Sequence, residues 1–198
     1  MAKKVIVLLA DGFEEVEAVT PIDYLHRAGI EVTTVSISDN TTVTGRWTGV
    51  KMLADTTLSE IRKQRTGGKA NNIWDAVVVP GGMPGASNLA ASKETGLLLK
   101  EMAADGKLIC AICASPVIVL APLGIIAGKK FTCYPGMEEN SKLKQCISDG
   151  AWSADSVVVD GSIITSRAAG TAGLFSIAII EKLLDKETAK KIAETVLL

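Results

Sequence analysis

Short, uninterrupted apolar runs alternate with amphipathic segments along this chain. Such runs occupy residues 5–9, 108–112 and, apart from Asp75, 74–79, while residues 31–37 are rich in β-branched side chains. Strands that are covered on both faces show continuous apolar runs of this length, whereas half-exposed strands alternate between apolar and polar positions. These runs therefore predict the strands of a mostly parallel sheet. Helices are expected from residue 114 onward and at residues 15–28, 93–104, 170–184 and 186–196.

Shorter elements complete the expected pattern. Two short strands are expected around a turn at Thr48-Gly49, another at residues 131–134, and a hairpin at residues 156–167. The polar segment 62–72 is typical of an exposed loop. Repeated β-α units place helices on both faces of a mostly parallel sheet, which makes the predicted fold class α/β.

Ligands of such sheets bind beyond the carboxyl ends of the strands. In this chain these ends come just after Leu9, Val79 and Ile112. We therefore look for the chemistry of the protein in the residues that follow these three positions.

Length, charge and composition narrow the function classes. A chain of 198 residues is expected to form one domain over residues 1–198, because it can bury roughly 70% of its unfolded surface. The formal net charge of −1 and the 4% aromatic content argue against a nucleic-acid partner. Proteins that bind nucleic acids usually carry an excess of basic residues and aromatic side chains that stack on bases.

The distribution of apolar residues argues against membrane insertion or export. No run of about 18 apolar residues occurs, so no membrane partner is expected. The N-terminal apolar run ends at Asp11 without a clear cleavage pattern, so it is interpreted as a strand rather than a signal peptide. We therefore expect a cytoplasmic protein whose four cysteines are thiols.

Cys113 is the strongest candidate for chemistry. It lies where the apolar strand 108–112 meets a helical segment, and its neighbours two positions away, Ala111 and Ser115, are small. A strained nucleophile elbow needs small residues at these positions, and the start of a helix favours a thiolate. The alternative is a buried structural cysteine, which is the usual role of a free cysteine.

Two further features follow buried strands. Gly81 and Gly82 come after the strand 74–79, where glycines allow close backbone approach and leave N–H groups for an oxyanion; the alternative is a plain turn. Glu17 belongs to an acidic cluster after the first strand, which by itself is an ordinary partner of a helix N-terminus. Pro21 cannot donate to the carbonyl of Glu17, so the helix should bend there.

Several motifs occur together and in a fixed order. They are Ala10-Asp-Gly-Phe-Glu-Glu-Val-Glu17, Pro21-Ile-Asp-Tyr-Leu-His-Arg-Ala-Gly29, Val79-Pro-Gly-Gly82, Ala111-Ile-Cys-Ala-Ser-Pro116 and Thr165-Ser-Arg167. With these motifs the chain resembles the ThiJ/PfpI superfamily, in the branch of the Parkinsonism-associated deglycase that is often called DJ-one. The resemblance spans nearly the whole chain.

The resemblance implies roles for particular residues. Cys113 would be a reactive, oxidisable nucleophile, and Glu17 the acid that hydrogen-bonds its sulfur. The amides of Gly82 and Ala114 would form an oxyanion pocket. The resemblance also implies a flavodoxin-like sandwich, a homodimer with the first helix at the contact, and activity without a cofactor. Three more residues are candidates for a substrate pocket, namely Gly81, Tyr134 and Arg167.

This sequence departs from the family pattern in its histidines. Many members place a histidine directly after the cysteine or before a later proline, but here those positions hold Ala114 and Tyr134. The single histidine, His26, follows Glu17 by nine residues, which is half a turn out of phase on a helix. We therefore expect His26 at the surface or at a dimer contact, rather than paired with Cys113.

The resemblance suggests a cysteine-dependent, cofactor-free glyoxalase or deglycase. Its substrates would be 2-oxoaldehydes such as methylglyoxal, or glycated molecules, and its product a 2-hydroxy acid. The alternatives are a redox sensor that acts through oxidation of Cys113, and a chaperone. An intracellular peptidase is disfavoured because it needs a histidine-type base, and a thiazole-phosphate biosynthesis protein is an older label of the family.

Two other sites are not expected. Cys110 and Cys113 form a Cys-x-x-Cys spacing, but an odd separation on a strand places them on opposite faces. One histidine and scattered cysteines do not supply convergent ligands, so no metal is predicted.

Overall fold

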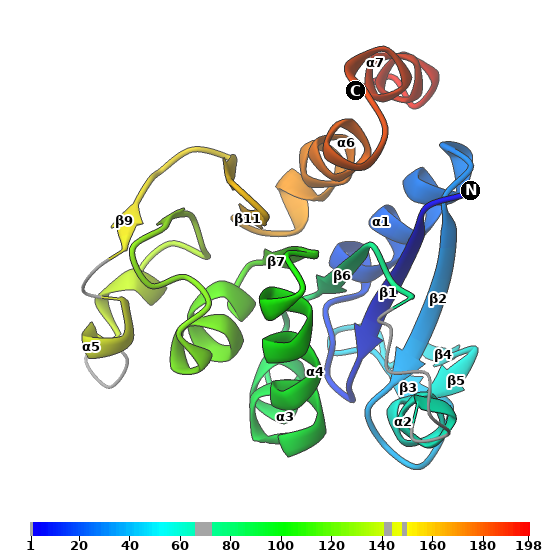
Figure 1. The fold of residues 1–198 in the computed structure, drawn as a ribbon, viewed down its shortest axis with the longest axis vertical. Helices are drawn as coiled ribbons and strands as arrows, with labels where there is room; N and C mark the ends of the chain where they lie inside the picture. Colours follow the sequence, from blue (N-terminus) through cyan, green and yellow to red (C-terminus); the bar gives the residue numbers. More distant parts are fainter. Residues whose placement is uncertain (1, 66–72, 141–143, 148–149) are drawn as a thin grey trace.

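A seven-stranded sheet runs through the middle of the molecule, with the order β10-β11-β7-β6-β1-β2-β5 (Figure 1). The computed structural model describes residues 2–65, 73–140, 144–147 and 150–198. All pairings within this sheet are parallel except that of β10 with β11, as expected from the apolar runs. The strands are β1 (Lys4–Leu9), β2 (Glu31–Ser36), β5 (Thr56–Thr57), β6 (Ala76–Val79), β7 (Leu108–Ile112), β10 (Val157–Asp160) and β11 (Ile163–Ser166).

The four central strands are buried on both faces. Val7, Val78, Cys110 and Ile164 pair in register from β1 across to β11, and all four side chains are inaccessible to solvent. Such a row explains why these strands are continuous apolar runs, since a polar residue at any of these positions would be desolvated without a partner.

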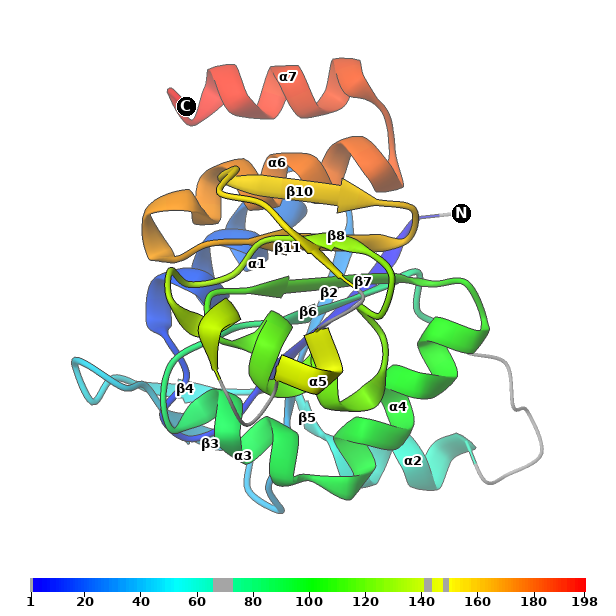
Figure 2. The same cartoon turned by 90° about the vertical axis from the view of Figure 1, so that its left-hand side faces the viewer.

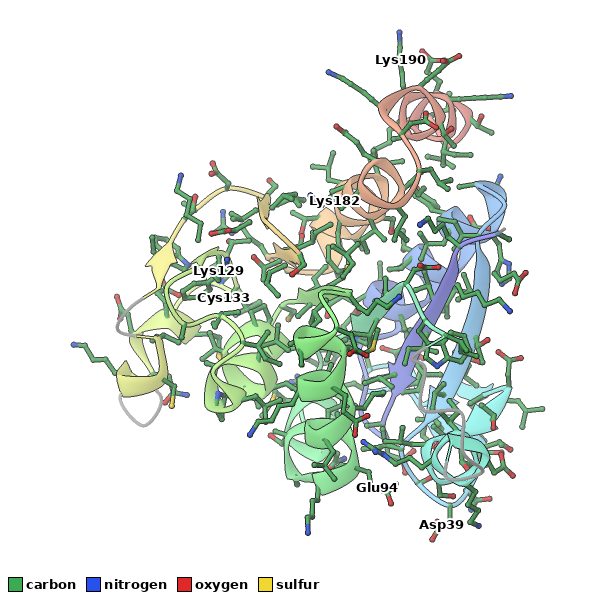
Figure 3. The ribbon with its side chains drawn as sticks, viewed as in Figure 1. Asp39, Glu94, Lys129, Cys133, Lys182 and Lys190 are labelled. Carbon is green, nitrogen blue, oxygen red and sulfur yellow. The ribbon has the colours of Figure 1, made fainter. Side chains whose placement is uncertain are left out.

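Helices cover both faces of the sheet, as the sequence predicts. Helices α1 and α6 pack on one face, and α2, α3 and α4 pack on the other (Figures 1 and 2). Helix α7 packs on the outer side of α6, where Lys190 extends away from the body of the molecule (Figure 3). The helices are α1 (Glu15–Arg27), α2 (Leu58–Arg65), α3 (Gly85–Ala91), α4 (Lys93–Ala104), α5 (Lys144–Ile147), α6 (Ala172–Leu183) and α7 (Lys186–Thr195). This is the expected flavodoxin-like α/β arrangement.

Two small two-stranded sheets lie beside the main sheet. The antiparallel pair β3 (Thr42–Thr44) and β4 (Lys51–Leu53) encloses the predicted turn at Thr48-Gly49. The parallel pair β8 (Lys130–Phe131) and β9 (Ala151–Trp152) forms the second. Strand β8 ends at Phe131 and not at the expected residue 134, because the N–H groups of Thr132 and Tyr134 donate to the Thr165 hydroxyl and the Cys113 carbonyl instead of to β9.

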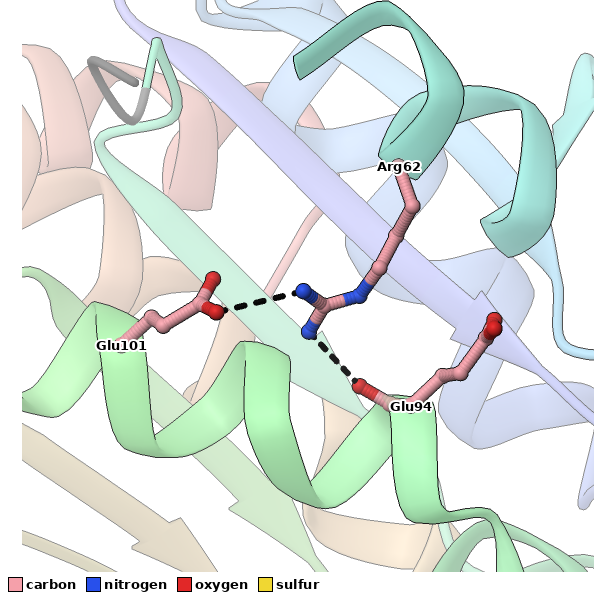
Figure 4. Close-up of polar contacts among 3 residues, drawn as sticks. All are labelled: Arg62, Glu94 and Glu101. Atoms are coloured by element: carbon pink, nitrogen blue, oxygen red, sulfur yellow. Dashed lines mark hydrogen bonds and ion pairs between the residues drawn. The ribbon is translucent and has the colours of Figure 1, made fainter. Parts of the chain in front are cut away.

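The segment predicted as a loop at 62–72 begins inside a helix. Arg62 belongs to α2, whose apolar residues Leu58 and Ile61 pack into the core and hold this helix against the protein. The Arg62 guanidinium donates to a Glu101 carboxylate oxygen at 3.2 Å and to the Glu94 carbonyl at 3.1 Å, both on α4 (Figure 4). The loop prediction is therefore wrong for residues 62–65, and residues 66–72 lie outside the described part of the chain.

The helix expected from residue 114 onward is also different. A π-helical segment spans Pro116–Leu120, and a 3-10 turn spans Ala121–Leu123. Pro122 lacks the N–H group with which a regular α-helix would continue, so the segment adopts these other turns. No helix among the described residues is long and apolar enough to cross a membrane.

The topology determines where a ligand can bind. The chain passes from β1 to β2 on one side and later returns to β6 on the other side of β1. This reversal makes the β1–β6 boundary a switch point, beyond which the two connecting loops diverge and leave a crevice. The loops after β1, β6, β7 and β11 all emerge at this edge of the sheet.

The packing of α6 on the sheet generates a stability prediction. Phe175 of α6 is fully buried, so Phe175→Ala is expected to lower the free energy of unfolding by about 3–5 kcal/mol. Its neighbour Leu174 is 46% exposed, and Leu174→Ala is expected to cost less than about 1 kcal/mol. Urea denaturation of both variants measures the two values. Equal costs would contradict the assignment of this face of α6 to the core.

Candidate active site

Cys113 occupies a strained turn directly after β7. Its φ angle is +64°, in the left-handed region that non-glycine residues seldom adopt. The Cys113 N–H donates to the Ser166 carbonyl at 3.0 Å, and its carbonyl accepts from the Tyr134 N–H at 2.8 Å. Hydrogen bonds on both sides therefore hold the backbone in this conformation, as expected of a nucleophile elbow.

Gly81 and Gly82 allow the loop after β6 to approach Cys113 closely. A Cβ on Gly81 would lie 2.6 Å from the Cys113 Cβ and 2.7 Å from Glu17 Oε2. Gly82 has a φ angle of +87°, and a Cβ there would lie 2.5 Å from the Glu14 nitrogen. Both positions therefore require glycine. The sequence alone could not decide whether these glycines form a plain turn or part of a site.

Glu17 lies under the sulfur, in the first turn of α1. Its side chain is 1% exposed, and Oε2 accepts a hydrogen bond from the Gly81 N–H at 2.9 Å. The Ala169 N–H and the Cys113 thiol also face this carboxyl group and lower its pKa. Loops from three strands thus enclose one carboxyl group together with one thiol.

Burial controls the protonation of this pair. Desolvation raises the pKa of Glu17 to about 7. Desolvation, together with the neighbouring Glu17 carboxylate, raises the pKa of the Cys113 thiol to about 12. The N–H groups of Gly82 and Ala114 are hydrogen-bonded to the sulfur and act in the opposite direction. Around neutral pH the thiol therefore keeps its proton, while the carboxyl group changes between its protonated and ionised forms.

This result corrects the expectation that the following helix favours a thiolate. No α-helix begins at Cys113; the segment after it continues as the π-helical turn at Pro116–Leu120. The Ser115 hydroxyl donates to the Pro80 carbonyl at 2.6 Å and thereby ties the β6 and β7 loops together. The amides of Gly82 and Ala114 lower the pKa of the thiol, but they do not outweigh the effect of burial.

A cavity of about 400 Å³ opens above the pair. The structure brings together there four of the residues that the sequence nominated, Cys113, Glu17, Gly82 and Ala114. Tyr134, half exposed, also lines it. The full lining consists of Glu14, Glu17, Arg46, Trp47, Gly82, Met83, Cys113, Ala114, Tyr134, Met137, Ala168 and Ala169.

Three other residues considered from the sequence lie outside the lining. Gly81 is behind Cys113 and Glu17, where it supports the pair instead of touching a ligand. The Arg167 guanidinium donates to the Ala154 carbonyl at 3.1 Å, away from the cavity wall. His26 is exposed on the last turn of α1, in agreement with the half-turn offset from Glu17.

The cation of the cavity comes from a loop that the sequence reasoning missed. Arg46, in the β3–β4 hairpin, lines the cavity and lies 4.3 Å above the ring of Trp47. Glu15 of α1 holds this loop, since its Oε1 accepts from the N–H groups of Trp47 and Thr48, each at 3.0 Å. The signal in the sequence was an Arg-Trp pair beside a predicted turn.

The other cysteines lie apart from this chemistry. Cys110 is fully buried on the β7 face that packs under α1 and α6, and burial raises its pKa. Cys133, on the segment after β8 (Figure 3), has its Sγ 3.7 Å from a Glu138 carboxylate oxygen. Within the described ranges, no group of three or more histidine, cysteine or acidic side chains converges on a metal position.

The raised pKa of Glu17 predicts a pH-dependent stability difference. Between its ordinary value of 4.5 and about 7, the folded state binds a proton that the unfolded state has released. Stability is therefore lost as pH rises through this window, by up to about 3 kcal/mol. Glu17→Gln avoids this loss, so its advantage in free energy of unfolding over the natural chain should be larger at pH 8 than at pH 4.5.

Urea unfolding at the two pH values measures this difference. The matched control is Glu31→Gln, which removes an exposed carboxylate from an ion pair with Lys4. It is expected to change the free energy of unfolding by less than about 1 kcal/mol at both pH values. An advantage of Glu17→Gln that does not grow with pH would contradict the buried, proton-binding carboxyl group.

Comparison with known proteins identifies the family of this chain. The model of the DJ-1/PfpI family matches residues 3–182. The chain is 38% identical over 192 residues to Protein DJ-1 homolog B of Arabidopsis thaliana, covering 96% of this chain but 40% of that relative, and so spans less than half of its length.

Two further relatives are similar over most of both chains. One is the Caenorhabditis elegans protein named Glutathione-independent glyoxalase DJR-1.2, 32% identical over 180 residues, which are 90% of this chain and 87% of that protein. The other is the solved structure of oxidized Toxoplasma gondii DJ-1, with a TM-score of 0.87, 37% identity, and coverage of 99% and 98% of the two chains. The chain belongs to the DJ-1/PfpI family.

Proposed function

We propose that this protein converts 2-oxoaldehydes such as methylglyoxal into 2-hydroxy acids, with Cys113 as nucleophile and without a cofactor. The juxtaposition of Cys113 and the buried Glu17 carboxyl group in the cavity carries the proposal. It is supported by the C. elegans relative, whose name describes a glutathione-independent glyoxalase. An aldehyde carbonyl is the electrophile that a single thiol and a nearby carboxyl group can activate without a metal.

The first step needs a base for the thiol proton. As the Cys113 sulfur attacks the aldehyde carbon, the Glu17 carboxylate accepts the thiol proton, and a C–S bond replaces the carbonyl π bond. The amides of Gly82 and Ala114 are placed to stabilise the alkoxide oxygen that forms. A carboxyl group with a pKa of about 7 suits this task, since it is largely ionised just above neutrality but holds the proton well enough to return it.

The next steps convert the hemithioacetal into product. The hydrogen on C1 moves to C2 through a carboxyl group, so C1 is oxidised to a thioester while C2 is reduced to an alcohol. Water then attacks the thioester carbon, the C–S bond breaks, and the Cys113 thiol regains a proton by way of Glu17. The balance is one 2-oxoaldehyde and one water consumed for one 2-hydroxy acid formed, with no external oxidant.

Lactate formation from methylglyoxal tests this function. The purified chain, without glutathione or added metal, is expected to produce lactate, and Cys113→Ala and Glu17→Gln are each expected to lower kcat by at least about 100-fold. In the natural chain kcat/KM should rise with pH through about 7, because only ionised Glu17 accepts the thiol proton. Chiral chromatography of the lactate shows whether one enantiomer forms. No lactate above the Cys113→Ala background would overturn the proposal.

A redox sensor is the second candidate for the same residues. Two main-chain N–H groups point at the Cys113 sulfur, and protonated Glu17 would add a third donor to the oxygens of a sulfinate. This candidate gains support if Cys113 alone is oxidised by mild peroxide, read by peptide mass, in a protein that does not turn over methylglyoxal. Trapping and turnover together would assign both properties to one site.

We also propose that the chain forms a homodimer through α1. Val16 and Val19 lie one turn apart on this helix, and each is about half exposed. A second copy of the chain would bury this apolar face.

Light scattering is expected to give twice the chain mass, and Val19→Lys to give the single mass because it places a charge in the contact. Val159→Lys, at an equally exposed position on β10, is the control; dissociation by both variants, or by neither, would contradict this interface.

A further inference from the structure

Glu14 is the second carboxyl group of the cavity. It precedes α1 as its N-cap, where its side chain accepts from the Glu17 N–H at 2.8 Å, and it lines the same cavity as Cys113. Glutamate is not among the residues that helices prefer as N-cap, because shorter side chains reach the free amides more directly. The longer glutamate side chain also forms part of the cavity wall. An aspartate or serine cap would extend less far toward the cavity.

Glu17 is poorly placed to move a proton between two substrate carbons. Its carboxyl group is engaged by the Gly81 N–H, the Ala169 N–H and the Cys113 thiol, and it is 1% exposed. It can exchange a proton with the sulfur and with an oxygen beside the sulfur. Glu14, in contrast, is half-buried, and its hydrogen bonds come from the amides of Glu17 and Val16 on the helix side.

We propose that Glu14 is a catalytic base that carries the hydrogen of substrate C1 to C2, while Glu17 serves the sulfur and the oxygens. This inference rests on the proposed function. The Glu14 carboxylate takes the C1 proton as Glu17, which holds the former thiol proton, protonates the oxygen on C2. An enediolate results, whose C1 oxygen is stabilised by the Gly82 and Ala114 amides. Glu14 then gives its proton to C2, the thioester forms, and both carboxylates are regenerated.

The charges around Glu14 suit a base in this position. Burial raises its pKa above the ordinary value, and the neighbouring Glu15 carboxylate adds to this rise, while the backbone amides of Glu17 and Val16 act against it. Arg46, whose backbone N–H donates to the carbonyl of Phe13 beside Glu14, acts against this rise and favours the charged form. Cys113 and Tyr134 are the other titratable side chains of the cavity. Glu14 is therefore a stronger base than an exposed carboxylate, and Arg46 offsets part of this rise in pKa.

The variant Glu14→Gln tests the assignment, because a glutamine oxygen can still accept the capping hydrogen bond but cannot carry a proton. We expect kcat to fall by at least about 100-fold. Methylglyoxal should still add to Cys113, seen by intact mass as one adduct per chain, since Glu17 is unchanged. Thermal unfolding should match that of the natural chain. Asp11→Asn, on the same loop but outside the cavity lining, is the control and should retain full turnover.

Solvent deuterium identifies which carboxyl group carries the proton. In D₂O, half-buried Glu14 exchanges with solvent, so lactate should carry deuterium on C2 in the natural chain. A shielded Glu17 would instead deliver the original hydrogen from C1. Retention of that hydrogen, or a Glu14→Gln kcat within about threefold of the natural chain, would overturn the role of Glu14. Absence of lactate and of the Cys113 adduct in the natural chain would instead overturn the proposed function itself.

Discussion

The close approach of the β6 and β7 loops is the constraint on which the site depends. There is no room for a Cβ at residue 81, since it would lie 2.6 Å from the Cys113 Cβ. Cys113 in turn holds a left-handed backbone conformation that its hydrogen bonds with Ser166 and Tyr134 maintain. Strands β11, β7 and β6 therefore fix the sulfur as a unit, and the Ser115 hydroxyl bound to the Pro80 carbonyl ties the two loops.

Enclosing the Glu17 carboxyl group removes it from water, and other interactions of the protein must offset this desolvation cost. A carboxyl group at 1% exposure is stable only with donors, and the structure supplies amides from two different loops, at Gly81 and Ala169. The buried row across the central strands supplies stability of the ordinary apolar kind. The middle of the sheet thus stabilises the fold, whereas its edge lowers stability, because reactivity there requires that Cys113 and Glu17 be poorly solvated.

Much of this arrangement could be predicted from the sequence, because strands buried on both faces leave continuous apolar runs. The strand ends after Leu9, Val79 and Ile112 locate the edge at which Glu17, Gly82 and Cys113 meet. The elbow at Cys113 was indicated by the small residues around it, and the structure confirms the expected backbone conformation.

The parts that escaped prediction depend on contacts between distant segments. The helix at Arg62 forms because apolar residues of α2 reach the core and α4 offers acceptors, neither of which shows in the polar sequence. Arg46 joins the cavity because Glu15, 31 residues earlier, binds the loop that carries it. Arg167 was placed correctly after a strand end, but the direction of its side chain is set by the Ala154 carbonyl.

Because no histidine lies near Cys113, carboxyl groups must act as the acid and the base of the site. A histidine can serve as acid and base at neutral pH without being shifted, whereas a carboxyl group must be desolvated to do so. Desolvation by itself would leave Glu17 shielded and committed to the sulfur. A second, more accessible carboxyl group in the same turn of helix provides what Glu17 lacks. In the segment Glu14-Glu15-Val16-Glu17, Glu14 is the N-cap in the cavity wall and Glu17 lies under the thiol. The first turn of one helix therefore supplies two carboxyl groups in different environments, each for different proton transfers.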